Sequence, residues 1–172
     1  QNAASAVELT DNEDLDWLGI HSTRLNGHLL RTIFRKNANP VVLKDPKRPL
    51  RFAEPLLIAA GWKPGFSTDY DTVLLAKRFG AKTVLNLSNT DYVYTKDPRK
   101  NPDAKQIKQL SWKEFRKIVG TKWVPGMNVP FDPLASAMAE KLGLRVAMLN
   151  GRNIKNLESF LSGRKFKGTI IS

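Results

Sequence analysis

The residues best suited to chemistry lie in one segment, Gly61–Asp71, which reads GWKPGFSTDYD. Its two glycines and its proline let the backbone turn sharply and approach a ligand closely. A helix that begins within the segment leaves unpaired N–H groups and the positive end of its dipole facing the loop, which favours a bound anion. Ser67, Thr68 and Asp69 can bond a phosphate or a ribose there, but such residues also cap ordinary helices, so both interpretations stay open.

A second polar segment, Ser88–Pro98, follows the apolar run at 83–87. Ligands of open α/β sheets lie outside the carboxyl ends of the strands, so polar and aromatic side chains in this segment are candidates for a site. Asp132 lies at the start of a further helix, with Pro133 in the first turn, and follows a proline-rich loop at 125–130.

Apolar runs and helical patterns alternate along the rest of the chain. This alternation predicts an α/β fold with parallel strand pairing. The predicted helices span residues 13–36, 68–79, 111–119, 132–142 and 154–161, and the predicted strands span residues 41–43, 56–60, 83–87, 145–149 and 168–171.

The first helical pattern, from about Glu13 to Lys36, is apolar on two sides. A helix of this kind packs either on its own sheet and on a partner subunit, which predicts a dimer, or entirely within one chain. The apolar residues are Leu15, Leu18, Ile20, Leu25, Leu29, Leu30, Ile33 and Phe34.

Composition narrows the class of protein. The chain has 172 residues, no cysteine and a net charge of +12, so disulfides, thiolate metal sites and catalytic thiols are excluded. Residues 61–172 carry 20 basic and 9 acidic side chains, which favours anionic partners such as nucleotide phosphates or a nucleic acid, although a basic surface can also serve solubility alone. The sequence has no apolar run long enough for a membrane span and no signal-peptide pattern, so we expect a cytoplasmic protein.

Six segments, taken in order, resemble the UMP (uridylate) kinases of the amino acid kinase family. They are Leu15–Ile20, Thr23–Gly27, Gly61–Asp71, Ser88–Pro98, Asp132–Ala135 and Gly168–Ile171. The resemblance implies a three-layer αβα sandwich with a mainly parallel sheet, in one domain over residues 1–172. It also implies transfer of the ATP γ-phosphoryl group to UMP, with Mg²⁺, and a hexamer of dimers joined through the helix at 13–36.

The resemblance also implies a role for each matching residue. Asp16 would hold the uridine ribose, and Asp69 and Asp132 would lie near the transferring phosphate, where Asp69 is the candidate ligand of Mg²⁺. The residues that would wrap UMP are Gly61, Trp62, Lys63, Pro64, Gly65, Phe66, Ser67 and Thr68. The residues that would form the adenine and ribose side of the ATP site are Ser88, Asn89, Tyr94 and Asp97.

The sequence departs from the family pattern at two points. Asp91-Tyr92 stands where the family usually has Asp-Gly, so either the turn is reshaped or a bulky side chain covers the ATP pocket. The family's opening strand, with its lysine, and its first glycine-rich loops have no counterpart before Gln1. The resemblance therefore implies an N-terminally incomplete domain, and we expect little activity from this chain alone.

Other functions remain as alternatives. One is a kinase for an acidic small molecule, such as acetylglutamate kinase, and another is a non-catalytic nucleotide-binding protein on the same fold. A nucleic-acid-binding module ranks lowest, because the basic residues are interspersed among helices rather than gathered with stacking aromatic side chains.

Overall fold

The computed structural model describes residues 11–122 and 129–172. The chain divides into two compact units, Gln1–Leu75 and Ala76–Ser172, and each is described by itself. The start of the chain and most of the predicted loop at 125–130 lie outside the described residues.

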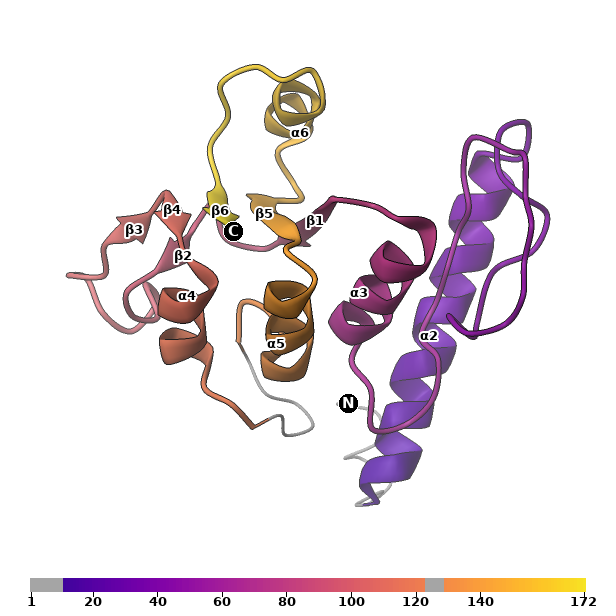
Figure 1. The fold of residues 1–172 in the computed structure, drawn as a ribbon, viewed down its shortest axis with the longest axis horizontal. Coiled ribbons are helices and arrows are strands. Elements are labelled where there is room, and N and C mark those ends of the chain that lie inside the picture. Colours follow the sequence, from indigo (N-terminus) through magenta and orange to yellow (C-terminus); the bar gives the residue numbers. More distant parts are fainter. Residues whose placement is uncertain (1–10, 123–128) are drawn as a thin grey trace. The chain divides into compact units, whose positions relative to one another are not determined.

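The first unit is dominated by one long helix, α2 (Asn12–Ile33) (Figure 1). Asp11 caps it by accepting a hydrogen bond from the Glu13 N–H at 2.7 Å, as N-cap chemistry requires. The helix ends before the predicted Lys36, because Phe34 already has non-helical backbone angles. Gly27 faces the unit's interior, where an added Cβ would lie 3.1 Å from Val42 Cγ1, so the helix packs closely on the extended chain.

The two strands predicted in the first unit are wrong. Residues 41–43 and 56–60 meet only at one isolated parallel bridge, Leu43 with Ala59, and a second isolated bridge joins Ala38 to Leu56. Pro40 and Pro55 stand directly before the two segments, and a proline cannot donate a hydrogen bond to a ladder. The segment at 56–60 is also exposed or half-buried rather than fully buried as its apolar sequence suggested.

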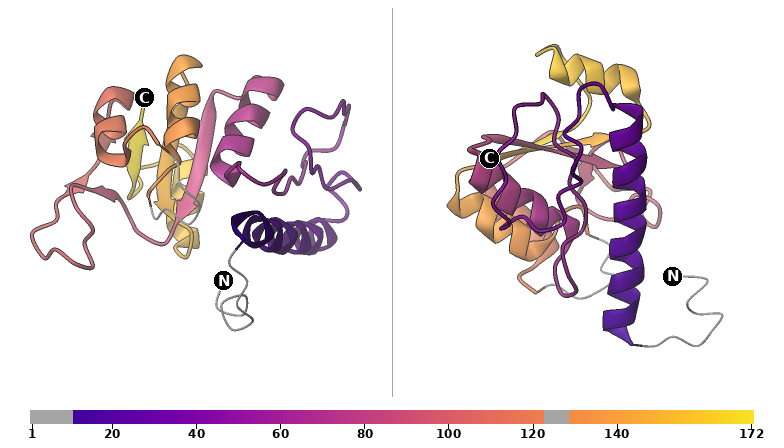
Figure 2. Two further views of the ribbon diagram at one scale, coloured as in Figure 1. Left: turned by 90° about the horizontal axis from the view of Figure 1, so that it is seen from below. Right: turned by 90° about the vertical axis from the view of Figure 1, so that its right-hand side faces the viewer.

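The second unit contains a four-stranded sheet with the order β1 (Thr83–Ser88), β5 (Arg145–Asn150), β6 (Thr169–Ile171), β4 (Gln109–Leu110). β1 runs parallel to β5, β4 runs parallel to β6, and only β5 and β6 are antiparallel. Helices α4 (Trp112–Val119) and α5 (Pro133–Lys141) lie on one face and α6 (Ile154–Leu161) on the other (Figures 1 and 2). The predicted α/β class, with three layers and a mainly parallel sheet, is confirmed in this unit.

The helices predicted in the second unit begin and end at residues whose types favour caps. Ser111 and Glu114 make a reciprocal capping box at the start of α4. Gly143 follows α5 with a φ of 60°, which is the left-handed conformation expected at a helix end. The apolar pattern of α5 predicts Leu134 in the core, and this prediction is wrong: Leu134 is 45% exposed, because the buried side of α5 is formed by small residues such as Ala135 and Ala139.

A short antiparallel hairpin, β2 (Val93–Tyr94) with β3 (Gln106–Ile107), was not predicted. Thr169 of β6 connects it to the sheet. The Thr169 hydroxyl accepts a hydrogen bond from the Val93 N–H at 2.8 Å and donates a short one to the Ile107 carbonyl. The hairpin is therefore fixed by a residue far along the chain.

None of the helices that the structure describes is both long enough and apolar enough to cross a lipid bilayer.

Candidate functional site

The segment at 61–65 is attached to α2 by three side chains. Asp16 Oδ2 accepts a hydrogen bond from the Gly65 N–H at 2.9 Å, and Thr23 Oγ1 accepts one from the Gly61 N–H at 2.9 Å. Arg24 donates from Nη2 to the Trp62 carbonyl at 2.8 Å. Three of the segments singled out in the sequence therefore come together within the first unit.

The segment leads into helix α3 (Thr68–Phe79). Ser67 Oγ accepts a hydrogen bond from the Tyr70 N–H at 3.1 Å, so Ser67 caps this helix. Asp69 and Asp71 lie in the first turn, where the helix dipole favours negative side chains. Asp69 is half-buried and Thr68 is exposed beside it.

Asp71 carries an unusual carboxylate. It is only 5% exposed, and its Oδ2 accepts a hydrogen bond from the Trp62 N–H at 3.0 Å. Its Oδ1 is buried and has no hydrogen-bond partner among the described residues. Burial raises the pKa of Asp71 to about 6, the Trp62 hydrogen bond opposes this rise, and the charge of Asp45 adds to it. Sequence reasoning gave Asp71 no role of its own.

Aromatic rings pack against one another, tilted rather than stacked, along the same segment. The Phe66 ring lies 5.0 Å from the Trp62 ring and 5.3 Å from the Tyr70 ring, measured between centroids. Two ammonium groups lie over Trp62, that of Lys63 at 4.6 Å and that of Lys47 at 4.9 Å. Lys47 was missed because it belongs to a separate charged loop that only the folded chain brings to this site.

A second candidate site is a cavity of about 330 Å³ within the second unit. It lies where β1 ends and contains all four residues expected on the ATP side, Ser88, Asn89, Tyr94 and Asp97. These four residues therefore line one cavity, and their part in an ATP site stays a prediction. Ile118 and Pro130 add apolar surface, and Asn86 donates a hydrogen bond to the Pro130 carbonyl at 3.1 Å. Such a mixed cavity is typical of a small-ligand site.

Tyr92 of the Asp91-Tyr92 turn forms part of the wall of this cavity. Asn150 at the end of β5 donates a hydrogen bond to Asp91 Oδ1 at 2.9 Å, which fixes the turn. The Tyr92 ring meets the Tyr94 ring edge-on, with centroids 6.5 Å apart. The bulky residue therefore stands at the wall of the cavity.

Asp132 is 3% exposed, and its Oδ1 accepts a hydrogen bond from the Ala135 N–H at 2.7 Å. This carboxylate caps α5, and it does not line the cavity. Asp69 belongs to the first unit and Asp132 to the second. Within the part of the chain that the structure describes, no three His, Asp or Glu side chains gather into a metal site.

A family model, related sequences and solved structures all show similarity between this chain and the amino acid kinase family. The model of the amino acid kinase family matches residues 2–150. A uridylate kinase from Methanospirillum hungatei is 36% identical over 160 residues, which cover 91% of this chain and 68% of that protein. One from Pyrococcus abyssi is 33% identical over 159 residues, covering 91% and 70%.

Solved structures resemble the fold. The crystal structure of the uridylate kinase from Archaeoglobus fulgidus superposes with a TM-score of 0.77 at 27% sequence identity, covering 99% of this chain and 77% of that chain. A UMP kinase from Bacillus anthracis gives a TM-score of 0.76 at 21% identity, covering 99% and 73%, and supports the fold alone.

Proposed function

This chain belongs to the amino acid kinase family, and from that premise we propose that it is a nucleoside monophosphate kinase that makes UDP from ATP and UMP. Its similarity to proteins named uridylate kinase extends over 91% of the chain. The observation that carries the proposal is the attachment of the segment at 61–65 to α2 through Asp16, Thr23 and Arg24.

The reaction needs no nucleophile from the protein. An oxygen of the UMP phosphate attacks the γ-phosphorus of ATP, the bond from that phosphorus to the β–γ bridging oxygen breaks, and ADP leaves. The protein must align the two nucleotides and neutralise charge that develops during the transfer.

We assign the acceptor site to the first unit. The Asp16 oxygen that does not bond Gly65 has no protein partner among the described residues, which leaves it able to accept from ribose hydroxyls. The backbone from Gly61 to Thr68 would wrap the nucleotide, and Lys63 would add positive charge beside it. The rings of Trp62 and Phe66 offer apolar surface to the base.

We assign the donor site to the cavity in the second unit. Ser88, Asn89 and Asp97 offer oxygen and nitrogen atoms to the adenine and ribose, and the Tyr94 ring offers an apolar surface. One Asp97 oxygen accepts from the Arg99 N–H at 3.0 Å, which fixes the loop that carries this carboxylate.

Magnesium fits the donor set of the first unit. Mg²⁺ is commonly held by one or two carboxylates together with substrate phosphates, and the half-buried Asp69 supplies one such carboxylate at a helix start. Bound there, the ion would neutralise phosphate charge. Asp132 belongs to the second unit, where its Oδ1 caps α5, and its catalytic role near the transferring phosphate stays a prediction from the family resemblance.

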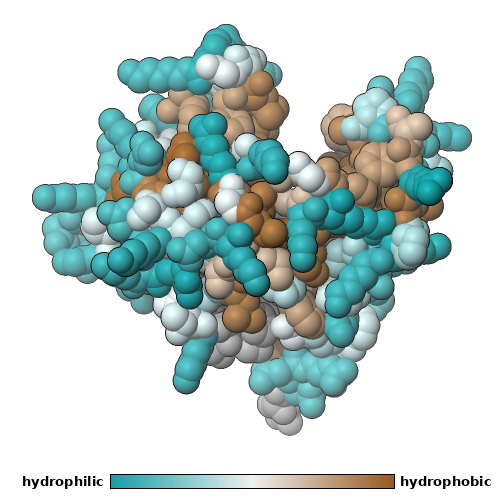
Figure 3. All heavy atoms as spheres, viewed as in Figure 1, coloured by the Kyte–Doolittle hydropathy of each residue, from teal (hydrophilic) through white to brown (hydrophobic). Residues whose placement is uncertain are grey.

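We further propose that α2 is the contact between subunits of a dimer-based hexamer, in a cytoplasmic enzyme. Apolar side chains gather on the surface over the C-terminal end of α2 (Figure 3). Contiguous exposed apolar surface of this kind marks an interaction site. The exposed residues are Leu18, Leu25, Leu29, Leu30, Ile33 and Phe34.

The double substitution Leu25→Glu and Leu29→Glu is expected to dissociate the dimer, because four charges at a two-fold contact would lose water without gaining partners. Sedimentation velocity measures the outcome. The double substitution Arg31→Glu and Arg35→Glu, on the same helix and the turn that follows it, is the control for added negative charge. Unchanged sedimentation of the leucine variant would show that α2 is not the contact.

Replacing Asp16 with asparagine is expected to weaken UMP binding about tenfold or more, because a charge-assisted hydrogen bond contributes roughly 1.5–3 kcal/mol. The substituted amide also lacks the negative charge that attracts the Gly65 N–H. Isothermal titration calorimetry with UMP gives the affinity. Asp14→Asn, an exposed substitution on the same helix, is the matched control and should leave it unchanged.

The same titration, together with thermal unfolding in the presence of each ligand, tests the proposed function itself. UMP should bind with saturation in the titration and raise the midpoint of thermal unfolding, whereas N-acetylglutamate should do neither. A chain that binds ATP but no UMP would instead be a nucleotide-binding protein of another kind. UDP formation from ATP, UMP and Mg²⁺ is the corresponding activity assay.

A further inference from the structure

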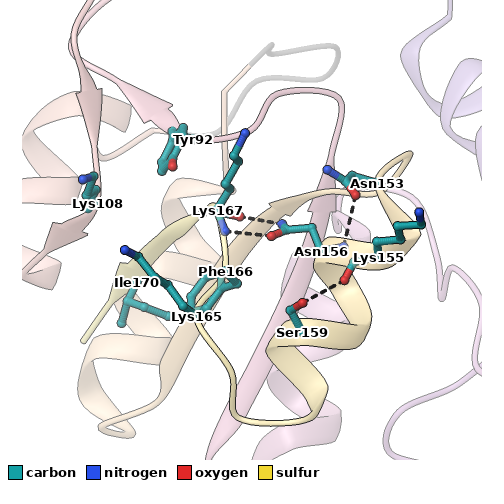
Figure 4. A pocket seen from close by; sticks show the side chains of 11 residues that line it. Tyr92, Lys108, Asn153, Lys155, Asn156, Ser159, Lys165, Phe166, Lys167 and Ile170 are labelled. Atoms are coloured by element: carbon teal, nitrogen blue, oxygen red, sulfur yellow. Dashed lines mark hydrogen bonds between the residues drawn. The ribbon is translucent and has the colours of Figure 1, made fainter.

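We propose that a second cavity in the second unit, between α6 and the start of β6, binds a small ligand that carries two or more phosphate groups (Figure 4). Its volume is about 710 Å³, which lies in the range of ligand pockets. We call it the lysine cavity and define it by Lys108, Lys155, Lys165 and Lys167, with Tyr92 and Phe166. It goes beyond the proposed function, which uses neither its lysines nor its apolar floor.

The charge of the lysine cavity is of one sign. Lys108, Lys155, Lys165 and Lys167 line it, and no carboxylate does. The ion pairs found among the described residues join other side chains, so none of these four ammonium groups is neutralised there. Like charges in a concave site focus a positive potential, and an anion with several charges would relieve their repulsion. Phosphate groups are anions that lysines commonly bind in proteins.

The backbone that presents two of these lysines is firmly held. Asn156 on α6 donates a hydrogen bond to the Lys167 carbonyl and accepts one from the Lys167 N–H, both at 2.7 Å. The next residue is Gly168, where an added Cβ would lie 2.6 Å from the Met148 carbonyl oxygen, so the chain passes directly against β5. A fixed backbone reduces the entropy that is lost when a ligand binds.

The floor of the lysine cavity is apolar. Phe166 packs edge-on against Phe160, with ring centroids 4.9 Å apart, and Ile170 lies beside it. Tyr92 forms the opposite wall (Figure 4). The family resemblance leads one to expect glycine at position 92, and a glycine has no side chain that could line the cavity. The floor accommodates a ring, so the phosphates can belong to a nucleotide or to an inorganic polyphosphate.

The test is calorimetric titration of the 172-residue protein with sodium tripolyphosphate in about 0.15 M salt, where weak long-range attraction is screened. The double substitution Lys165→Ala and Lys167→Ala should weaken binding about tenfold or more, because two charge-assisted contacts are lost. The control is Lys113→Ala with Lys117→Ala, which removes the same charge from exposed positions on α4 and should change affinity less than about twofold. Thermal midpoints confirm that both variants fold.

Three results would overturn the proposal. The first is that tripolyphosphate does not bind the unsubstituted protein. The second is that the Lys165/Lys167 variant binds tripolyphosphate as tightly as the unsubstituted protein does. The third is that the Lys113/Lys117 control loses as much affinity as the Lys165/Lys167 variant. Tighter binding of a twelve-nucleotide RNA through the same lysines would also overturn it in favour of a nucleic-acid surface.

Two further titrations separate the sources of phosphate and the two proposals. Displacement of tripolyphosphate from the unsubstituted protein by ATP supports a nucleotide as the ligand, and its absence supports inorganic polyphosphate. UMP should bind the unsubstituted protein and both lysine variants equally. If UMP binds none of the three proteins, only the proposed acceptor site is contradicted. The proposal for the lysine cavity depends on tripolyphosphate binding alone.

Discussion

Replacing Phe115 with alanine is expected to lower the free energy of unfolding by about 3–5 kcal/mol, the usual cost of deleting a fully buried aromatic ring. Phe115 on α4 is 0% exposed and meets the Trp112 ring edge-on at 6.1 Å. Trp112 in turn lies 6.5 Å from the Phe131 ring and donates from Nε1 to the Leu144 carbonyl. The substitution would leave a cavity at the centre of this cluster.

Urea unfolding followed by circular dichroism measures the loss. Leu161→Ala at the end of α6 is the control, because Leu161 is 69% exposed, and exposed substitutions usually change stability by about 0.5 kcal/mol or less. A loss below about 1 kcal/mol at Phe115 would mean that the aromatic cluster does not form the core of the second unit.

Asp71→Asn is expected to abolish a loss of up to about 3 kcal/mol in the free energy of unfolding that the unsubstituted protein shows as pH rises, since each pKa unit corresponds to about 1.4 kcal/mol. The pKa of Asp71 rises from 3.8 to about 6 in the folded protein, so the folded state binds the proton more tightly. Between these two values the native protein holds more protons than the unfolded chain, and stability falls as pH rises. Asparagine cannot ionise, so this fall disappears in the variant.

The measurement is urea unfolding of both proteins at pH 4 and at pH 8. From pH 4 to pH 8, the free energy of unfolding of the variant should rise relative to that of the unsubstituted protein. This rise does not depend on how much stability the substitution costs through altered packing, because that cost is the same at both pH values. Asp45→Asn should shift this pH window to lower pH, because it removes the negative charge that raises the pKa of Asp71. Parallel curves for the Asp71 variant and the unsubstituted protein would show that Asp71 is not buried as an acid.

Local signals in the sequence predicted local structure well. The capping box at Ser111, the cap at Asp132 and the left-handed glycines after α3 and α5 all act within one turn of chain, so the sequence around them specifies them. The mainly apolar segments at 83–87 and 145–149 were equally clear, and they form β1 and β5. Ser88, Asn89, Tyr94 and Asp97, which the family resemblance assigns to the ATP site, line one cavity in the structure, and their role in binding ATP stays a prediction.

Long-range contacts explain what the sequence did not predict. β2, β3 and β4 have two residues each, too few for any periodicity, and Thr169 fixes the hairpin from the far end of the chain. Lys47 reaches Trp62 from another loop, and Asp71 acquires its shifted pKa only on burial. The segments at 41–43 and 56–60 have strand-like composition but form only isolated bridges.

The organisation of residues 1–172 as a single domain stays a prediction.

The hydrogen bonds of Thr169 have a consequence for local opening. A hairpin with two residues in each strand is unstable by itself. Because the Val93 amide donates to the Thr169 hydroxyl, this amide can exchange its hydrogen with solvent only when the contact with β6 breaks. The loop at one side of the donor cavity and the last strand of the chain should therefore open as one cooperative unit.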